Sequence, residues 1–69
     1  MDEFELGERE FVELKNLLKI MGVFESGGEA MAAVAAGQVT VDGQVELRKR
    51  CKVRSSQVVE SAGHKIKVV

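Results

Sequence analysis

The sequence has few of the residues that usually carry chemistry. It holds one cysteine, Cys51, and one histidine, His64, and it contains no proline, tyrosine or tryptophan. A single cysteine excludes an internal disulfide, and no histidine or cysteine cluster has the spacing of metal ligands. No apolar run approaches the roughly 20 residues that a membrane-spanning helix needs. We therefore expect no metal, no cofactor and no membrane contact.

Groupings typical of an enzyme are also missing. Cys51 lies among cations that would lower the pKa of an exposed thiol, but its alternation with Lys52 and Arg54 favours a small buried residue over a nucleophile. A chain of 69 residues buries only about 60% of its unfolded surface, which leaves no room for a deep substrate pocket. The sequence therefore predicts one domain, residues 1–69, that is not an enzyme and takes no small-molecule substrate.

Two features favour a cytoplasmic location. A lone cysteine fits a reducing compartment. The first residues are acidic and lack the basic and then apolar order of a signal peptide.

The charges are divided unevenly along the chain. Residues 1–47 hold ten acidic and three basic side chains, whereas residues 48–69 hold seven basic side chains and one acidic one, Glu60. The net charge of the whole chain is only −1. Such an asymmetry points to nucleic acid or another anionic surface as the partner. Two solvated faces of opposite charge would also account for it.

Apolar residues in the first third recur at two different spacings. Phe4 and Leu6 alternate with glutamates, which predicts a short edge strand over residues 3–6. The next apolar residues fall three or four apart, at Phe11, Leu14, Leu18 and Met21. This spacing predicts an amphipathic helix from about Glu8 to Met21, with three glutamates at the positive end of its dipole and Gly22 as its stop.

A second helix is predicted to begin at Ser26. Ser26 and Glu29 have the spacing of a capping box, and an alanine-rich segment runs from there to Gly37. Gly27 and Gly28 would expose backbone N–H groups at the positive end of the helix dipole, where an anion is favoured. The start of this helix is therefore either a phosphate seat or a capped helix entered through a flexible turn.

The rest of the chain reads as strands. Asp42-Gly43 is a strong hairpin signal, and a three-residue loop over 41–43 would pair Val39 with Val45 and keep apolar residues on one face. We expect this loop rather than a two-residue turn, with Gly43 in the left-handed conformation. Further strands are expected over 51–54, 57–60 and 65–69. The predicted fold class is α+β, with two antiparallel helices packed on a small, mostly antiparallel sheet.

The strongest signal for a binding site is a run of cations after the hairpin. Five of seven consecutive positions are basic: Arg48, Lys49, Arg50, Lys52 and Arg54. Arginine can grip a phosphate through two parallel hydrogen bonds, lysine acts as a point charge, and such contacts dominate affinity for nucleic acids. A solvated loop, or an edge strand protected by charge, is the other interpretation.

Motifs in both halves of the chain resemble one known family. Ser26 and Ala30, followed by G-Q-V-T-V-D-G over residues 37–43, are similar to the helix start and hairpin of the RNA-binding domain named after the fourth small-subunit ribosomal protein. S-G-G-E-A, V-D-G-Q-V-E and R-K-R-C-K-V resemble the short free-standing bacterial YbcJ-like proteins over nearly the whole chain. The resemblance implies the ribosomal-protein-four-like (alpha-L) fold and a non-catalytic module that binds RNA.

The resemblance also implies where RNA would dock. The expected site joins the basic run to the second helix and the hairpin, through Ser26, Gly27, Gly28, Gln44, Arg48, Lys49, Arg50, Lys52 and Arg54. The broader family usually has arginine at the position of Gly27 and often lysine at that of Met31, so binding would rest more heavily on residues 48–54.

The kind of RNA is suggested by the scarcity of aromatic residues. The three phenylalanines, Phe4, Phe11 and Phe24, are expected in the core, which leaves few rings to stack on unpaired bases. We therefore expect a monomer that docks structured RNA by shape and backbone. The alternative is a protein-interaction module whose basic stretch docks an acidic protein partner.

Overall fold

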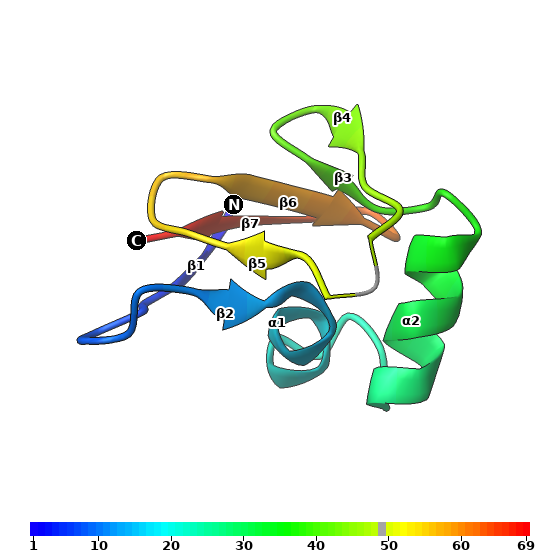
Figure 1. The fold of residues 1–69 in the computed structure, drawn as a ribbon, viewed down its shortest axis with the longest axis horizontal. Helices are drawn as coiled ribbons and strands as arrows, with labels where there is room; N and C mark the ends of the chain where they lie inside the picture. The colour runs from blue at the N-terminus through cyan, green and yellow to red at the C-terminus, as the bar shows by residue number, and fades with distance from the viewer. Residues whose placement is uncertain (49) are drawn as a thin grey trace.

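The computed structural model describes residues 1–48 and 50–69, in which short strands and two helices alternate along the chain (Figure 1). Five strands form the main sheet, in the order β1 (Asp2–Phe4), β7 (His64–Val68), β6 (Val58–Ser61), β3 (Thr40–Val41) and β4 (Gln44–Val45). Strand β1 runs parallel to β7, and the other neighbours are antiparallel. Strands β2 (Val12–Glu13) and β5 (Lys52–Val53) form a separate antiparallel ribbon. The α+β class and the mostly antiparallel sheet are confirmed.

Both helices, α1 (Leu14–Ile20) and α2 (Gly27–Ala35), lie on the same side of the main sheet (Figure 1). The core fills the space between these layers, and its largest fully buried side chains are Leu14, Leu17, Leu18, Val34, Val39, Val53, Val59, Ile66 and Val68. In β7 the alternation is as predicted, because Ile66 and Val68 are buried whereas Lys65 and Lys67 are exposed. Neither helix in the described part of the chain is long and apolar enough to span a bilayer.

Helix α2 begins and ends as its sequence predicts. The hydroxyl of Ser26 accepts a hydrogen bond from the Glu29 amide at 3.2 Å, which caps the first turn. At the other end the amides of Gly37 and Gln38 donate to carbonyls of the last turn, and Gly37 has a φ of +74°. This left-handed closing motif is the one that glycine favours at a helix end.

Helix α1 is shorter than the periodicity predicts. It begins at Leu14 rather than near Glu8, so no acidic residue lies in its first turn. The preceding residues are extended because Val12 pairs with Val53 across the β2–β5 ribbon, and both valines are buried there. The amide of Leu14 then donates to the Cys51 carbonyl at 2.9 Å. Pairing with a distant strand has therefore overridden the local helical pattern.

The hairpin has a two-residue turn, so the predicted three-residue loop is wrong. The register pairs Thr40 with Val45 and Val41 with Gln44. Asp42 and Gly43 both have positive φ, +52° and +82°, which is the turn whose twist matches that of the flanking strands. Matching apolar faces was a poor guide because Val45 is 58% exposed and contributes little to the core.

Candidate nucleic-acid interface

Residues 51–54, which include strand β5, present two cations to solvent and two small residues to the core. The chain leaves β4, turns where the Cys51 amide donates to the Arg48 carbonyl at 3.3 Å, and enters β5. Cys51 and Val53 are buried, whereas Lys52 and Arg54 are exposed, as the alternation predicts. The extended backbone thereby aims two positive side chains the same way.

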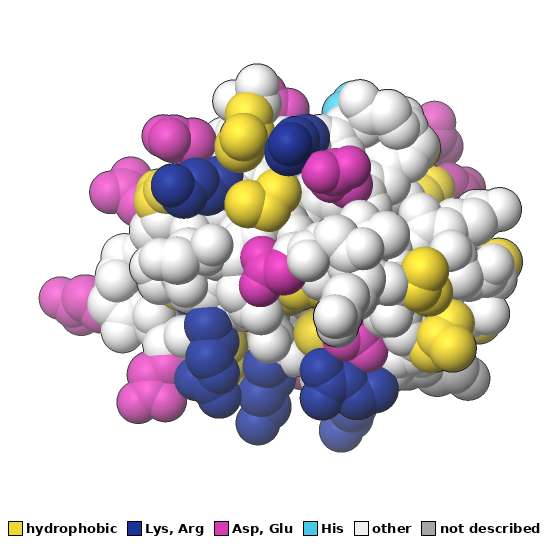
Figure 2. All heavy atoms as spheres, turned by 90° about the horizontal axis from the view of Figure 1, so that it is seen from above, with side chains coloured by type: hydrophobic (Ala, Val, Ile, Leu, Met, Phe, Trp, Pro, Cys, Tyr) yellow, Lys and Arg dark blue, Asp and Glu magenta, His cyan; other side chains and the backbone are white. Residues whose placement is uncertain are grey.

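These cations border an open surface hollow of about 440 Å³. Its lining consists of Arg48, Arg50, Lys52, Arg54 and Gln57. In Figure 2 the dark blue side chains form a row along the lower edge of the molecule, and a second group lies apart at the upper edge. Four of the five predicted cations thus come together, and the fifth, Lys49, lies outside the described residues.

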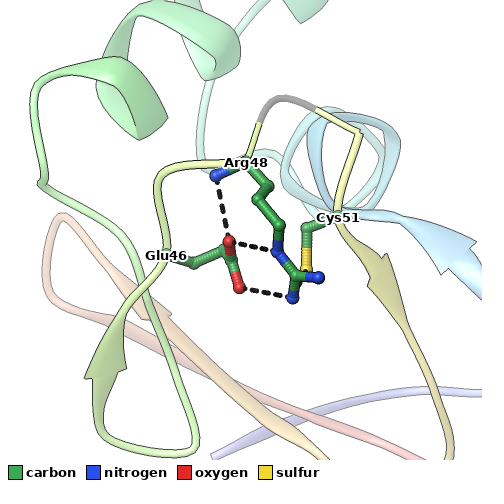
Figure 3. A network of polar contacts seen from close by, with 3 residues as sticks. All are labelled: Glu46, Arg48 and Cys51. Carbon is green, nitrogen blue, oxygen red and sulfur yellow. Dashed lines mark hydrogen bonds and ion pairs between the residues drawn. The ribbon is translucent and has the colours of Figure 1, made fainter.

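Arg48 is held by a carboxylate of its own chain (Figure 3). Glu46 Oε2 accepts from both the Arg48 amide and Nε at 2.9 Å, and its Oε1 accepts from Nη2 at 3.0 Å. The hydrogen bonds from Arg48 lower the pKa of Glu46 to about 2, so this carboxylate is charged at any physiological pH. The same contacts raise the pKa of Arg48 further.

This ion pair changes what Arg48 can contribute. Its side chain is 77% exposed, but its positive charge is offset by Glu46, whose side chain is only 14% exposed. The basic run in the sequence does not reveal this pairing of Arg48 with Glu46. Its guanidinium has five N–H donors, so those not used by Glu46 can still meet an anion in the hollow.

Phe11 lies beside the cations and not in the core. The Lys52 Nζ atom is 4.8 Å from the centre of its ring, and the Arg54 Cζ atom is 5.7 Å from it. The helical spacing of the apolar residues predicts that this side chain points into the core. The segment before α1 is instead extended, and this conformation turns Phe11 to the outer face of the β2–β5 ribbon. Phe4 is buried, and Phe24 is partly buried against the core, as expected.

Gln57 is a member of the hollow that the sequence did not reveal. Its Oε1 accepts from the Arg54 amide at 2.7 Å, and its Nε2 donates to Asp42 at 3.4 Å. Asp42 also accepts from the Val58 amide at 2.9 Å. These hydrogen bonds connect the hairpin turn to the start of β6 and to the backbone of Arg54. They thereby hold one end of the row of cations formed by Arg48, Arg50, Lys52 and Arg54. A lone glutamine before a strand carries no sequence signal for this role.

The remaining predicted site residues lie elsewhere on the surface. Ser26, Gly27 and Gly28 form the start of α2, and Gln44 is an exposed residue of edge strand β4. None of these four residues belongs to the lining of the hollow between the cations and Gln57. The structure therefore brings four cations of the basic run together, and the lining of their hollow includes neither the helix start nor Gln44.

Cys51 has the surroundings of an inert thiol. It is 4% exposed, and burial raises the pKa of its thiol, which is the opposite of activation. The Nη2 of Arg48 reaches its Sγ at 3.9 Å, a weak contact. Within residues 1–48 and 50–69, no three histidine, cysteine or acidic side chains gather to hold a metal ion.

Sequence and structure comparisons identify the class of domain. The model of the S4 domain family matches residues 4–69, and the chain belongs to this family. The Escherichia coli (strain K12) protein named "Putative RNA-binding protein YbcJ" is 54% identical over 69 residues, which cover 100% of this chain and 99% of that protein. The YbcJ protein of Shigella flexneri has the same identity and coverage.

A solved relative has the same fold. The solution structure of YbcJ from Escherichia coli, described as revealing an "ALFAL" motif involved in RNA binding, matches with a TM-score of 0.78 and 54% identity. The match covers 100% of this chain and 87% of that one. The predicted resemblance and the α+β fold are confirmed by these comparisons.

Proposed function

We propose that this chain is a non-catalytic RNA-binding module that docks structured RNA through the cation row of residues 48–54. The observation that carries the proposal is the convergence of Arg48, Arg50, Lys52 and Arg54 around one open hollow. The family membership and the names given to the YbcJ relatives support RNA as the polyanion. The module acts as a monomer in the cytoplasm, without cofactor or small-molecule substrate.

The hollow suits a phosphate backbone better than a small ligand. It is open, and cations rather than apolar walls form most of its border. Phosphates along a strand present repeated negative charges, and each one neutralised by lysine or arginine releases counterions and adds to affinity. Recognition of this kind follows the shape of the RNA and not its sequence.

The start of α2 and Gln44 would extend the contact beyond the hollow. The amides of Glu29 and Ala30 are already bonded to Ser26, so Gly27 and Gly28 supply the helix-end amides left for an anion. A structured RNA is large enough to reach more than one surface of so small a domain. Lys49 belongs to the proposed site by its place in the sequence.

Two double variants, each of which replaces two basic residues with alanine, test the site. Arg50→Ala with Lys52→Ala removes two charges from the hollow, whereas Lys65→Ala with Lys67→Ala removes the same charge from the outer face of β7. Fluorescence titration with an RNA hairpin at several salt concentrations should show weaker binding for the first pair and a salt slope flatter by roughly one to two units. The variant with Lys65→Ala and Lys67→Ala should retain most of the salt dependence of RNA binding. Thermal melts should confirm that both variants fold.

The outcomes separate RNA binding from docking of an acidic protein. Equal losses for the two pairs would mean that net charge, and not the hollow, sets the affinity. If the parent protein ignores structured RNA but binds an acidic polypeptide in a manner that Arg50→Ala with Lys52→Ala abolishes, the hollow is a protein-docking surface instead.

A further inference from the structure

Phe11 is an aromatic side chain at the border of the proposed RNA site that the core does not use. Its segment runs into β2, where Val12 turns inward to the core and leaves Phe11 on the outer face of the ribbon. The register of that ribbon pairs Val12 with Val53, so its continuation places Phe11 opposite Arg54. Lys52 lies two residues before Arg54, on the same face of the ribbon. Phe11 is partly exposed and is absent from the apolar cluster that Phe4 joins and Phe24 packs against.

We infer that the Phe11 ring is a stacking site for one unpaired nucleobase of the bound RNA. The inference deepens the proposed function and rests on it. A cationic groove that follows the backbone, with an aromatic ring beside it, is the combination that proteins use to hold an unstacked base. Because Arg54 and Lys52 both border the hollow and approach this ring, a phosphate in the hollow would bring its own base near Phe11.

The cations that now approach the ring do not prevent stacking. The Lys52 Nζ at 4.8 Å sits at the end of a flexible side chain and is a compact point charge. An exposed contact between a cation and a ring is weaker than stacking of a base on an aromatic side chain. When RNA binds, the Lys52 ammonium can therefore move onto a phosphate while a base stacks on the Phe11 ring, and these two contacts together are stronger than the contact between lysine and ring that they replace.

This site narrows the class of RNA. A continuous duplex keeps its bases stacked on one another and presents only its backbone and grooves. A hairpin with a bulged nucleotide, or a helix end with an overhanging one, supplies both the paired backbone for the cations and a free base for Phe11. The preferred RNA is thus structured but interrupted next to the docking point.

The test compares two hairpins that differ in one bulged nucleotide. The bulge carries 2-aminopurine, whose fluorescence falls when it stacks, and the second hairpin is fully paired. The parent should bind the bulged hairpin roughly tenfold more tightly and quench its fluorescence. Phe11→Leu keeps an apolar side chain but loses the ring, so it should abolish both the preference and the quenching while binding the paired hairpin as before.

Two further variants keep the outcome interpretable. Phe11→Tyr retains the ring and should retain the preference, whereas Phe24→Leu makes the matched change at the partly buried phenylalanine away from the cations and should leave it intact. If Phe11→Leu binds both hairpins as the parent does, the stacking site is refuted while RNA binding stands. If the parent binds neither hairpin, the proposed function and this inference fall together.

Discussion

Among residues 1–48 and 50–69, Glu46 is the one acidic side chain that forms an ion pair with a cation lining the hollow, and neutralising it should strengthen RNA binding. Its carboxylate is held 2.9 Å from Arg48 Nε and stays charged because its pKa is lowered to about 2. Glu46→Gln removes the negative charge but keeps an oxygen that can accept the Arg48 amide hydrogen bond. The hollow would then face the RNA with one more uncompensated positive charge.

The size of the effect follows from the geometry. A phosphate on the open edge of the Arg48 guanidinium would lie about 6 Å from the carboxylate, which costs about 0.7 kcal/mol in a water-like dielectric and about twice that where the effective dielectric is halved. Removing this repulsion should tighten binding roughly three- to tenfold. The salt slope should steepen by about 0.9, the contribution of one more neutralised phosphate. Stability should fall by less than about 1 kcal/mol, because the Arg48 partner is exposed.

The assay is a titration of an RNA hairpin against the parent, Glu46→Gln, Arg48→Ala and the double variant. Arg48→Ala should weaken binding, since it removes donors and leaves the Glu46 carboxylate unpaired beside the RNA, and Glu46→Gln in the same chain should restore part of the loss. The carboxyl group titrates far below neutrality, so the gain from Glu46→Gln should be the same at pH 5.5 and pH 8. Weaker binding by Glu46→Gln would refute this reasoning and show that Glu46 orients Arg48 for the phosphate.

Two other predictions concern the fold around the site. Val39→Asp should lower stability by a few kcal/mol, because it puts a charge at a position with no exposed surface, and an unchanged melting temperature would contradict that burial. Cys51 should react with a thiol reagent far more slowly in the folded chain than in denaturant, since it is buried and its pKa is raised; rapid labelling of the native protein would reopen a reactive role for it.

Local signals in the sequence predicted the secondary structure correctly in segments whose conformation depends on their own residues. Ser26 and Glu29 specify the start of α2, and the glycines at 22 and 37 end the two helices through left-handed closing motifs. Alternation likewise identified the inward residues of β5 and β7, because period two is the same whatever the strand pairs with.

Where the prediction from sequence was wrong at the start of α1, pairing with a strand distant in the sequence determines the structure. Residues 11–14 fit a helical stripe, yet they also alternate between partly exposed and buried, and only the approach of β5 selects the extended form. This choice moved Phe11 from the predicted core to the border of the cation row. In the hairpin, the preference of Asp42-Gly43 for a two-residue turn outweighed the matching of Val39 with Val45.

Counting charges along the chain predicts the basic run but does not reveal that Arg48 is paired with Glu46. The count assigns Glu46 to the acidic first part and Arg48 to the basic second part, although they are two residues apart. Residues at that spacing share a side of an extended segment, so their side chains can meet, and here they form a two-point ion pair. In the described part of the chain no carboxylate forms such a pair with Arg50, Lys52 or Arg54. The salt dependence of RNA binding shows whether Glu46 offsets the charge of Arg48. If Arg48 acted as an independent cation, Glu46→Gln would leave the salt slope unchanged. If the Glu46 carboxylate offsets Arg48, the slope should steepen by about 0.9 in this variant.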